Sequence, residues 1–413
     1  MKKMTIIALV VAITAVFAVS AMANEWNLYG SARMATFYTN RDYGDLFNNL
    51  GEGGNDIFGN GDYSSTQWAL QGNSRIGATV KGDMLEGRFE YGAGKPTATT
   101  ENYANVRRLY GVWHFTEGWG LKVGKDYTPI TFFLSGQVFD ADAGLLQVGN
   151  AYGSRKGQVA VEGMLGPGQF KFAAIEQNVA NVSFTSTGTG PGGTDVTLQT
   201  QTQSYWPKLE TSYEMKFGDN ISAHAFGGYQ SLKYYTNNPD TGANNSKTLN
   251  SYMVGVGGDL NFGPMFVKPQ ASYYYNGQAA GGLGLASANA TSYSGFSTLS
   301  GIDNFAPTVI NGSVDNIKSF MAMLALGFSP TESMTLEGGI GWLYQKSDGD
   351  QSIDKNTYLE YYLQLVWKMA PSVYLIPEVG YRDFGDYEYS NPNIADKNIG
   401  SLFYAGAKWQ IDF

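Results

Sequence analysis

The sequence ends in GAKWQIDF (residues 406–413), a stretch in which apolar and polar side chains alternate strictly. Successive side chains of an extended strand point to opposite faces of a sheet, so the stretch predicts a strand with one apolar and one polar face. The alternation alone does not say whether the apolar face meets a protein core or lipid. The apolar set is Trp409, Ile411 and Phe413, and the polar set is Lys408, Gln410 and Asp412.

Two other stretches keep the two-residue period over more than ten residues. They are QTQSYWPKLETSYEMKF (201–217) and TYLEYYLQLVWKM (357–369). A strand in a soluble sandwich usually has ~5 to 6 residues, whereas a tilted strand needs ~9 to 11 residues to cross a bilayer. The length of these patterns therefore favours strands that span a membrane.

The connections between the alternating segments differ regularly in length. Hydrocarbon offers backbone groups no hydrogen-bond partner, so only a closed sheet can cross it. We therefore predict an all-β fold: a transmembrane antiparallel β-barrel of about sixteen strands, with short periplasmic turns and long extracellular loops. The seven short turns lie near residues 83, 118, 167, 219, 263, 331 and 370, and the eight long loops at about 41–65, 95–105, 128–154, 178–202, 236–248, 277–316, 346–356 and 385–399.

The first residues have the order of a secretory leader. Lys2 and Lys3 precede an apolar run from Thr5 to Val19, and Ala-Met-Ala ends at residue 23. The run is shorter than the ~20 residues needed to span a bilayer and ends on small residues suited to cleavage. We predict a signal peptide over 1–23 and one barrel domain over 24–413, located in the outer membrane of a Gram-negative bacterium.

The composition excludes several classes of function. There is no cysteine, there are two histidines, and the net charge is −9, which argues against thiol chemistry and nucleic-acid binding. No nucleophile–base pair, phosphate-binding loop or zinc spacing occurs, so we expect no enzyme activity, no catalytic residue, no metal site and no cofactor. The acidic loops lack the spacing of an EF-hand, and solvated loops are the default interpretation over calcium sites.

The sequence resembles the Gram-negative general porins, in the stretches WNLYGSARMATFY (26–38), SRIGATVKGD (74–83) and KVGKDYTPITFF (122–133) and in its aromatic-terminated last strand. The resemblance implies a homotrimer in contact with outer-membrane lipids and lipopolysaccharide. It also implies that Trp409, Ile411 and Phe413 are read by the barrel-assembly machinery. By position, Thr128 to Arg155 corresponds to the loop that folds into the lumen and narrows it, with Asp140 and Asp142 as its acidic edge. The acidic proline–aromatic–glycine motif of the enteric members is absent.

A sixteen-stranded barrel is wide enough for an aqueous channel, and polar parity predicts which side chains line it. Arg33, Arg75 and Arg88 come from successive early strands and are expected to face Asp140 and Asp142 across the constriction. Arg107 and Arg108 are adjacent, so we expect only Arg108 to point inward. The remaining predicted lining residues are Lys156, Glu162, Lys208, Glu210, Lys268, Glu378, Arg382 and Lys408. Each has the simpler interpretation of a solvated interior position.

These patterns predict a channel for passive diffusion of small hydrophilic solutes and ions. One alternative is a channel selective for an anion, a sugar or another small solute, with inward tyrosines as a binding track. Another is a plugged barrel whose loops serve an adhesive or structural role. The acidic loops favour a mild preference for cations, while the basic interior acts in the opposite direction. The tyrosines with inward parity are Tyr29, Tyr110, Tyr274, Tyr374 and Tyr404.

Overall fold

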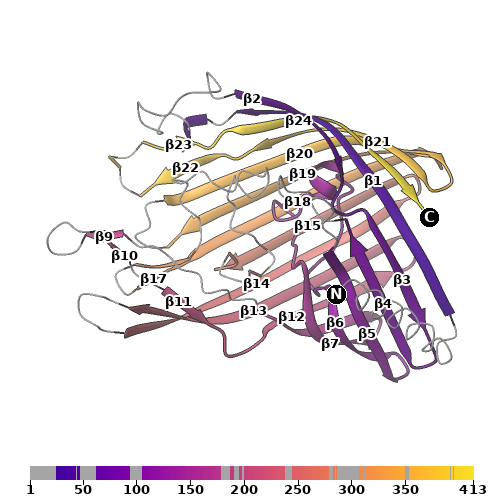
Figure 1. The fold of residues 1–413 in the computed structure, drawn as a ribbon, viewed down its shortest axis with the longest axis horizontal. Coiled ribbons are helices and arrows are strands. Elements are labelled where there is room, and N and C mark those ends of the chain that lie inside the picture. The colour runs from indigo at the N-terminus through magenta and orange to yellow at the C-terminus, as the bar shows by residue number, and fades with distance from the viewer. Residues whose placement is uncertain are drawn as a thin grey trace, which may run out of the picture.

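The fold is seen in a computed structural model of the 413-residue chain (Figure 1). The structure describes residues 25–42, 44–46, 62–93, 105–177, 187–189, 195–197, 200–237, 244–278, 282–283, 285, 307–310, 313–348, 353–390, 392–393 and 395–413. The predicted signal peptide and parts of several predicted long loops lie outside these residues.

Sixteen antiparallel strands form one closed barrel, as predicted. The second strand is interrupted, so β2 and β3 both pair with β1, on its two ends. Short pieces, β11 and β22, continue the walls of β12 and β21. The barrel strands are β1 (Glu25–Asp42), β2 (Asp62–Leu70), β3 (Arg75–Lys81), β4 (Leu85–Gly92), β5 (Asn105–Thr116), β6 (Trp119–Tyr127), β7 (Arg155–Leu165), β8 (Gly168–Ile175), β11 (Thr200–Gln203), β12 (Lys208–Phe217), β13 (Ile221–Asn237), β14 (Asn244–Phe262), β15 (Met265–Tyr275), β18 (Ile317–Thr331), β19 (Met334–Ser347), β20 (Ile353–Ala370), β21 (Val373–Asp383), β22 (Asp386–Tyr389) and β24 (Ser401–Asp412).

Several smaller elements are not counted among the sixteen barrel strands. They are η1 (Gly44–Leu46), α2 (Phe139–Asp142), β9 (Thr187–Thr189) with β10 (Asp195–Thr197), β16 (Thr308–Ile310) with β17 (Ser313–Asp315), and β23 (Lys397–Asn398). None of the helices in the described ranges is long and apolar enough to cross a membrane.

The barrel closes where the first and last strands meet (Figure 1). β1 pairs with β24 from Ser31 opposite Asp412 to Asp42 opposite Ser401. At the end of the seam, Gly30 and Phe413 exchange two backbone hydrogen bonds of 2.6 and 3.1 Å. A Cβ atom at position 30 would collide with the Phe413 ring, so only glycine at this position allows the terminal aromatic ring to pack here.

The alternation predicted from the sequence separates the two faces of the wall. In β24 and the residue after it, Trp409, Ile411 and Phe413 are 46%, 53% and 72% exposed, whereas Lys408 is 5% exposed. In β20, Tyr361 and Leu363 are exposed while Glu360 and Gln364 are buried. Because large apolar side chains on one sheet face need an apolar surrounding, the outer surface fits lipid, and the polar residues face the interior.

The two sides of the barrel differ in height. β3, β4, β6 and β8 have 7 to 9 residues, whereas β13, β14, β18 and β20 have 15 to 19. Figure 1 shows the long strands running the length of the molecule and the short early strands gathered at one end. The seven turns at that end have two or three residues, for example between Lys81 and Leu85.

The interior is not wholly aqueous, contrary to the simple expectation for so wide a barrel. Residues 128–154, here called L3, leave β6 and fold inside the barrel, where their apolar side chains join inward residues of the long strands in one core. We call this half of the lumen the packed half. The core includes Ile130, Leu134, Val138, Phe139, Leu145 and Val148 of L3, and Phe226, Met253, Met321, Met323, Leu343, Tyr362, Ile376 and Tyr404 of the wall.

Candidate functional site

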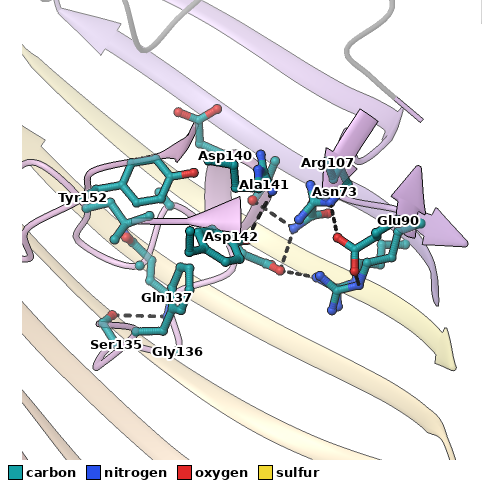
Figure 2. Close-up of a pocket in the computed structure, with 18 of the residues that line it drawn as sticks. Asn73, Glu90, Arg107, Ser135, Gly136, Gln137, Asp140, Ala141, Asp142 and Tyr152 are labelled. Carbon is teal, nitrogen blue, oxygen red and sulfur yellow. Dashed lines mark hydrogen bonds and ion pairs between the residues drawn. The ribbon is translucent and has the colours of Figure 1, made fainter. Parts of the chain in front are cut away.

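A cavity of about 640 Å³ remains between L3 and the short-strand side of the wall. Its lining combines the inner faces of β1 and β3–β5 with L3, and Figure 2 shows its residues in close-up. We call it the basic cavity, because seven cationic side chains line it against three acidic ones. The cations are Arg33, Arg75, Arg88, Arg107, Arg108, Arg155 and Lys408, and the acids are Glu90, Asp140 and Asp142.

Side chains in the break between β2 and β3 hold L3 against this cavity. Gln71 donates to the Val138 carbonyl at 3.1 Å, and Asn73 donates both to the Ala141 carbonyl at 2.9 Å and to the Asp142 carboxylate at 2.6 Å (Figure 2). Both donors are buried side-chain amides in the turn that joins β2 to β3. The interruption of the strand thus places two polar side chains of the wall against L3.

L3 turns through a backbone conformation that is rare for residues with side chains. Asp140, Ala141 and Asp142 have φ values of 52°, 61° and 64°. A left-handed conformation costs roughly 1 to 2 kcal/mol per such residue. The surrounding contacts must therefore offset several kcal/mol to hold this turn, and the carboxylates of Asp140 and Asp142 are among the groups that are held.

The two aspartates of L3 are in direct ion pairs. Asp142 contacts Arg33 and accepts a 2.9 Å hydrogen bond from Lys408, while Asp140 lies 3.5 Å from Arg382. The predicted arrangement, with Arg33 facing Asp140 and Asp142 across an open constriction, is therefore wrong in its geometry. Asp142 neutralises part of the basic wall instead of opposing it across water.

Three arginines converge on one buried carboxylate. Glu90 is 1% exposed and lies 2.7 Å from Arg107, 3.4 Å from Arg88 and 3.9 Å from Arg75. Tyr29 donates to the same carboxylate at 2.9 Å and accepts from Arg88 at 2.8 Å. One negative charge compensates one of the three positive charges, so this cluster keeps a net positive charge beside the cavity.

Both Arg107 and Arg108 line the basic cavity, so the expectation that only Arg108 points inward is wrong. The register between β4 and β5 shifts at this point. Glu90 pairs with Arg108, but the next residue, Tyr91, pairs with Val106, so Arg107 has no partner in the register. Arg107 is the extra residue of this β-bulge, and a bulge redirects side chains that regular alternation would separate. Arg108 pairs with Asp126 at 2.7 Å.

The opposite side of L3 is anchored by buried carboxylates of the wall. Glu378 accepts hydrogen bonds from the backbone of Val138 at 2.6 Å and of Phe139 at 3.0 Å. Glu337 accepts from the Gly136 backbone at 2.6 Å. A buried backbone donor left without a partner costs about 1 to 3 kcal/mol, so these contacts hold the backbone of L3 in place.

Further anchors of L3 come from side chains of the long strands. Gln137 donates to Glu360 at 2.6 Å and to Tyr404 at 2.8 Å. Arg382, which is fully buried, donates to Glu360 at 2.7 Å. The predicted lining residues Glu378 and Arg382 thus hold L3 instead of facing open solvent.

Other predicted lining residues lie away from the basic cavity. Lys208 and Glu210 form a buried 3.1 Å pair on β12, and Lys268 lies 3.4 Å from Asp259. Glu162 accepts a hydrogen bond from Lys122 at 2.9 Å. Both residues line a second cavity of about 230 Å³, next to the first residues of L3. Arg155, and not its neighbour Lys156, lines the basic cavity.

Sequence reasoning missed several lining residues. Asn73 sits in a break that no periodic pattern predicts, and Arg155 has outward parity at a strand end, where parity is least reliable. Tyr127, Phe133 and Tyr152 also line the cavity, and the only sequence signal for them was their position in or beside the predicted inward loop. Burial raises the pKa of the Tyr152 hydroxyl, so it stays neutral at physiological pH. In the described ranges, no group of three or more potential ligands could hold a metal ion.

Comparisons with known proteins find similarity in fold alone. No protein-family model matches the chain, and no curated protein matches it. The outer membrane channel DcaP of Acinetobacter baumannii is similar in structure, with a TM-score of 0.60, 15% identity, and coverage of 94% of this chain and 97% of that one.

Two solved porin structures are also similar to this chain in fold and low in sequence identity. OmpF of Salmonella typhi has a TM-score of 0.55 at 12% identity over 95% of this chain and 99% of that one. An anion-selective porin from Comamonas acidovorans has a TM-score of 0.51 at 11% identity, over 94% and 99% of the two chains. The chain therefore has the fold of the Gram-negative outer-membrane porins, a closed sixteen-stranded barrel.

Proposed function

We propose that the protein is an outer-membrane channel through which small hydrophilic solutes and ions diffuse passively. The apolar outer face, the closed barrel and the charged cavity beside L3 support this function, and the porin fold agrees with it. A homotrimer is the proposed assembly, and the trimer form of OmpT from Vibrio cholerae, which has a TM-score of 0.54 to this chain, supports it. Outer-membrane lipids, lipopolysaccharide and the barrel-assembly machinery remain predicted partners.

The observation that carries the proposal further is the charge of the basic cavity. Seven cations against three acids leave an excess of positive charge where L3 narrows the lumen. A confined site lined by one sign of charge concentrates ions of the opposite sign. We therefore propose a preference for anions, in place of the mild cation preference that the acidic loops suggest. A porin of similar fold from Comamonas acidovorans is anion-selective, which supports this proposal.

The first experiment is conductance of the purified protein in a planar bilayer, followed by the reversal potential in a KCl gradient. We expect steady conductance, and we expect the sign of the reversal potential to show that chloride is more permeant than potassium. A protein that inserts as a folded barrel but carries no current would contradict the channel and favour the plugged barrel with adhesive or structural loops.

The double variant Arg88→Gln, Arg107→Gln tests the location of the selectivity. It removes two of the seven cations and should shift the reversal potential toward cations. The control is Lys318→Gln, which removes one positive charge outside the basic cavity, near the first residue of β18, where Lys318 pairs with Asp348 at 2.8 Å. An equal shift in the control would place the selective charge outside the basic cavity.

A further inference from the structure

Phe133 is an unusual residue for the interior of a barrel. Phe133 belongs to L3, which is otherwise largely buried, yet its side chain is 53% exposed. It lines both the basic cavity and the smaller cavity next to the first residues of L3. The residues on either side of it pack inward: Leu134 is 7% exposed, and the partly buried Phe132 stacks on His224 with ring centroids 3.8 Å apart. The loop thus buries Leu134, packs Phe132 against the core and presents Phe133 to the cavities.

Two tyrosines surround Phe133 without stacking on it. Tyr127 meets it edge to face at 4.9 Å and 80°, and Tyr152 lies at 6.5 Å and 57°. Aromatic rings contribute further binding energy when a second ring packs against them in offset or edge-to-face geometry. The half of the Phe133 surface that remains exposed is therefore available to a ring that enters the cavity.

Positive charge is held beside these rings. The guanidinium groups of Arg108 and Arg155 lie 5.4 and 5.3 Å from the centre of the Tyr127 ring. Arg155 also donates to the Tyr127 hydroxyl at 3.2 Å. Arg108 is paired with Asp126, whereas Arg155 forms no ion pair with any residue in the described ranges. A planar guanidinium without a carboxylate partner is suited to bind a carboxylate through two parallel hydrogen bonds.

We propose that this corner of the basic cavity is a binding subsite for small planar aromatic carboxylates. The ring of the solute packs against Phe133, and its carboxylate binds Arg155. The inference rests on the proposed channel function and adds a solute class to it. A saturated carboxylate of equal charge and similar size binds Arg155 and buries apolar surface against Phe133, but it lacks the ring–ring interaction, so the subsite separates aromatic from aliphatic anions.

The test uses single-channel recording of the full-length protein with benzoate and cyclohexanecarboxylate, which share one charge and nearly the same size. Benzoate should block with a Kd roughly three- to tenfold lower, the range expected for one aromatic pair. Phe133→Leu keeps the site apolar and should abolish the difference. Arg155→Gln should weaken block by both anions. Phe172→Leu, at an outward position that is 42% exposed, is the control and should change neither.

The outcomes separate the two proposals. A protein without conductance overturns the channel function and this inference with it. A conducting channel that benzoate and cyclohexanecarboxylate block equally overturns the subsite alone. Retained discrimination in Phe133→Leu also overturns it. Titration calorimetry of each variant with benzoate, in detergent and after its folded barrel has been checked by heat-modifiable gel mobility, distinguishes loss of binding from loss of folding.

Discussion

The two halves of the lumen follow the same alternation and have opposite chemistry. On β1, β3 and β4, inward positions carry Arg33, Arg75, Arg88 and Glu90 and leave a cavity. On the long strands, inward positions such as Met321 and Met323 pack against L3. The closed sheet decides only which side chains point inward. The identity of those side chains decides whether the space becomes a core or a passage.

L3 therefore behaves like an element of a soluble domain enclosed by the barrel. One face is buried in an apolar core, and the other carries Asp140 and Asp142 at the boundary with the charged half. Core contacts lose several kcal/mol when a large side chain is removed, whereas charges that line a confined aqueous space act on the ions that enter it. The packed half should control whether the loop stays in place, and the charged half should control which ions pass.

The largest expected effect comes from Phe139→Ala in the packed half. Phe139 stacks on Tyr404 at 3.8 Å and meets Phe37 at 5.2 Å. Its removal should destabilise the docking of L3 by about 3 to 5 kcal/mol, as large-to-small core substitutions of aromatic residues do. Hydrogen exchange of the L3 amides would measure the loss, and the single-channel current should become noisy as the loop moves.

Phe133→Ala is the matched control for that variant. It removes the same side chain from the same loop at a position that is half exposed, so L3 docking should change far less than in Phe139→Ala. If both variants accelerate exchange of the L3 amides equally, the division into a packed and a charged half is wrong.

The sequence predicted the barrel because several long segments alternate with a period of two and the connections between them differ regularly in length. The lipid-facing set of Trp409, Ile411 and Phe413 is one example, and the structure shows it on the outer face. Arg33, Arg75, Arg88 and Lys408 were likewise placed inward by parity, and they line one cavity. Strand parity depends only on local spacing, which one sequence shows directly.

Other features depend on contacts that local spacing does not contain. Arg107 turns inward because β5 bulges, and Glu378 holds L3 because a distant loop packs on it. Phe132 and Phe133 are chemically identical neighbours, and only the path of L3 determines that the first packs against the core and the second is half exposed. Tertiary packing decides these positions, so they could not be predicted from periodicity.

A smaller effect is expected from Asp142→Asn in the charged half. The substitution keeps the shape of the side chain and removes the charge that neutralises Arg33 and Lys408. Two charges 4 Å apart interact by about 1 kcal/mol in water, so the chloride-to-potassium permeability ratio should rise about two- to fivefold. Reversal potentials measure this ratio. Asp219→Asn, the same change in an exposed turn, should leave the ratio as it is, and a matching rise there would refute a local action of Asp142.

The smallest effect is the dependence of selectivity on salt, and it distinguishes the basic cavity from the acidic loops. The Debye length is ~10 Å at 0.1 M and ~3 Å at 1 M ionic strength, so charges that act at a distance lose their influence first. A permeating anion passes the cavity arginines nearly in contact, because seven cations line about 640 Å³. The chloride preference should therefore be weaker at 1 M than at 0.1 M, but it should not vanish. The preference that remains at 1 M should be larger in Asp142→Asn than in the wild type. Complete loss of preference at 1 M would instead assign the selectivity to distant charges, because those alone are fully screened at that concentration.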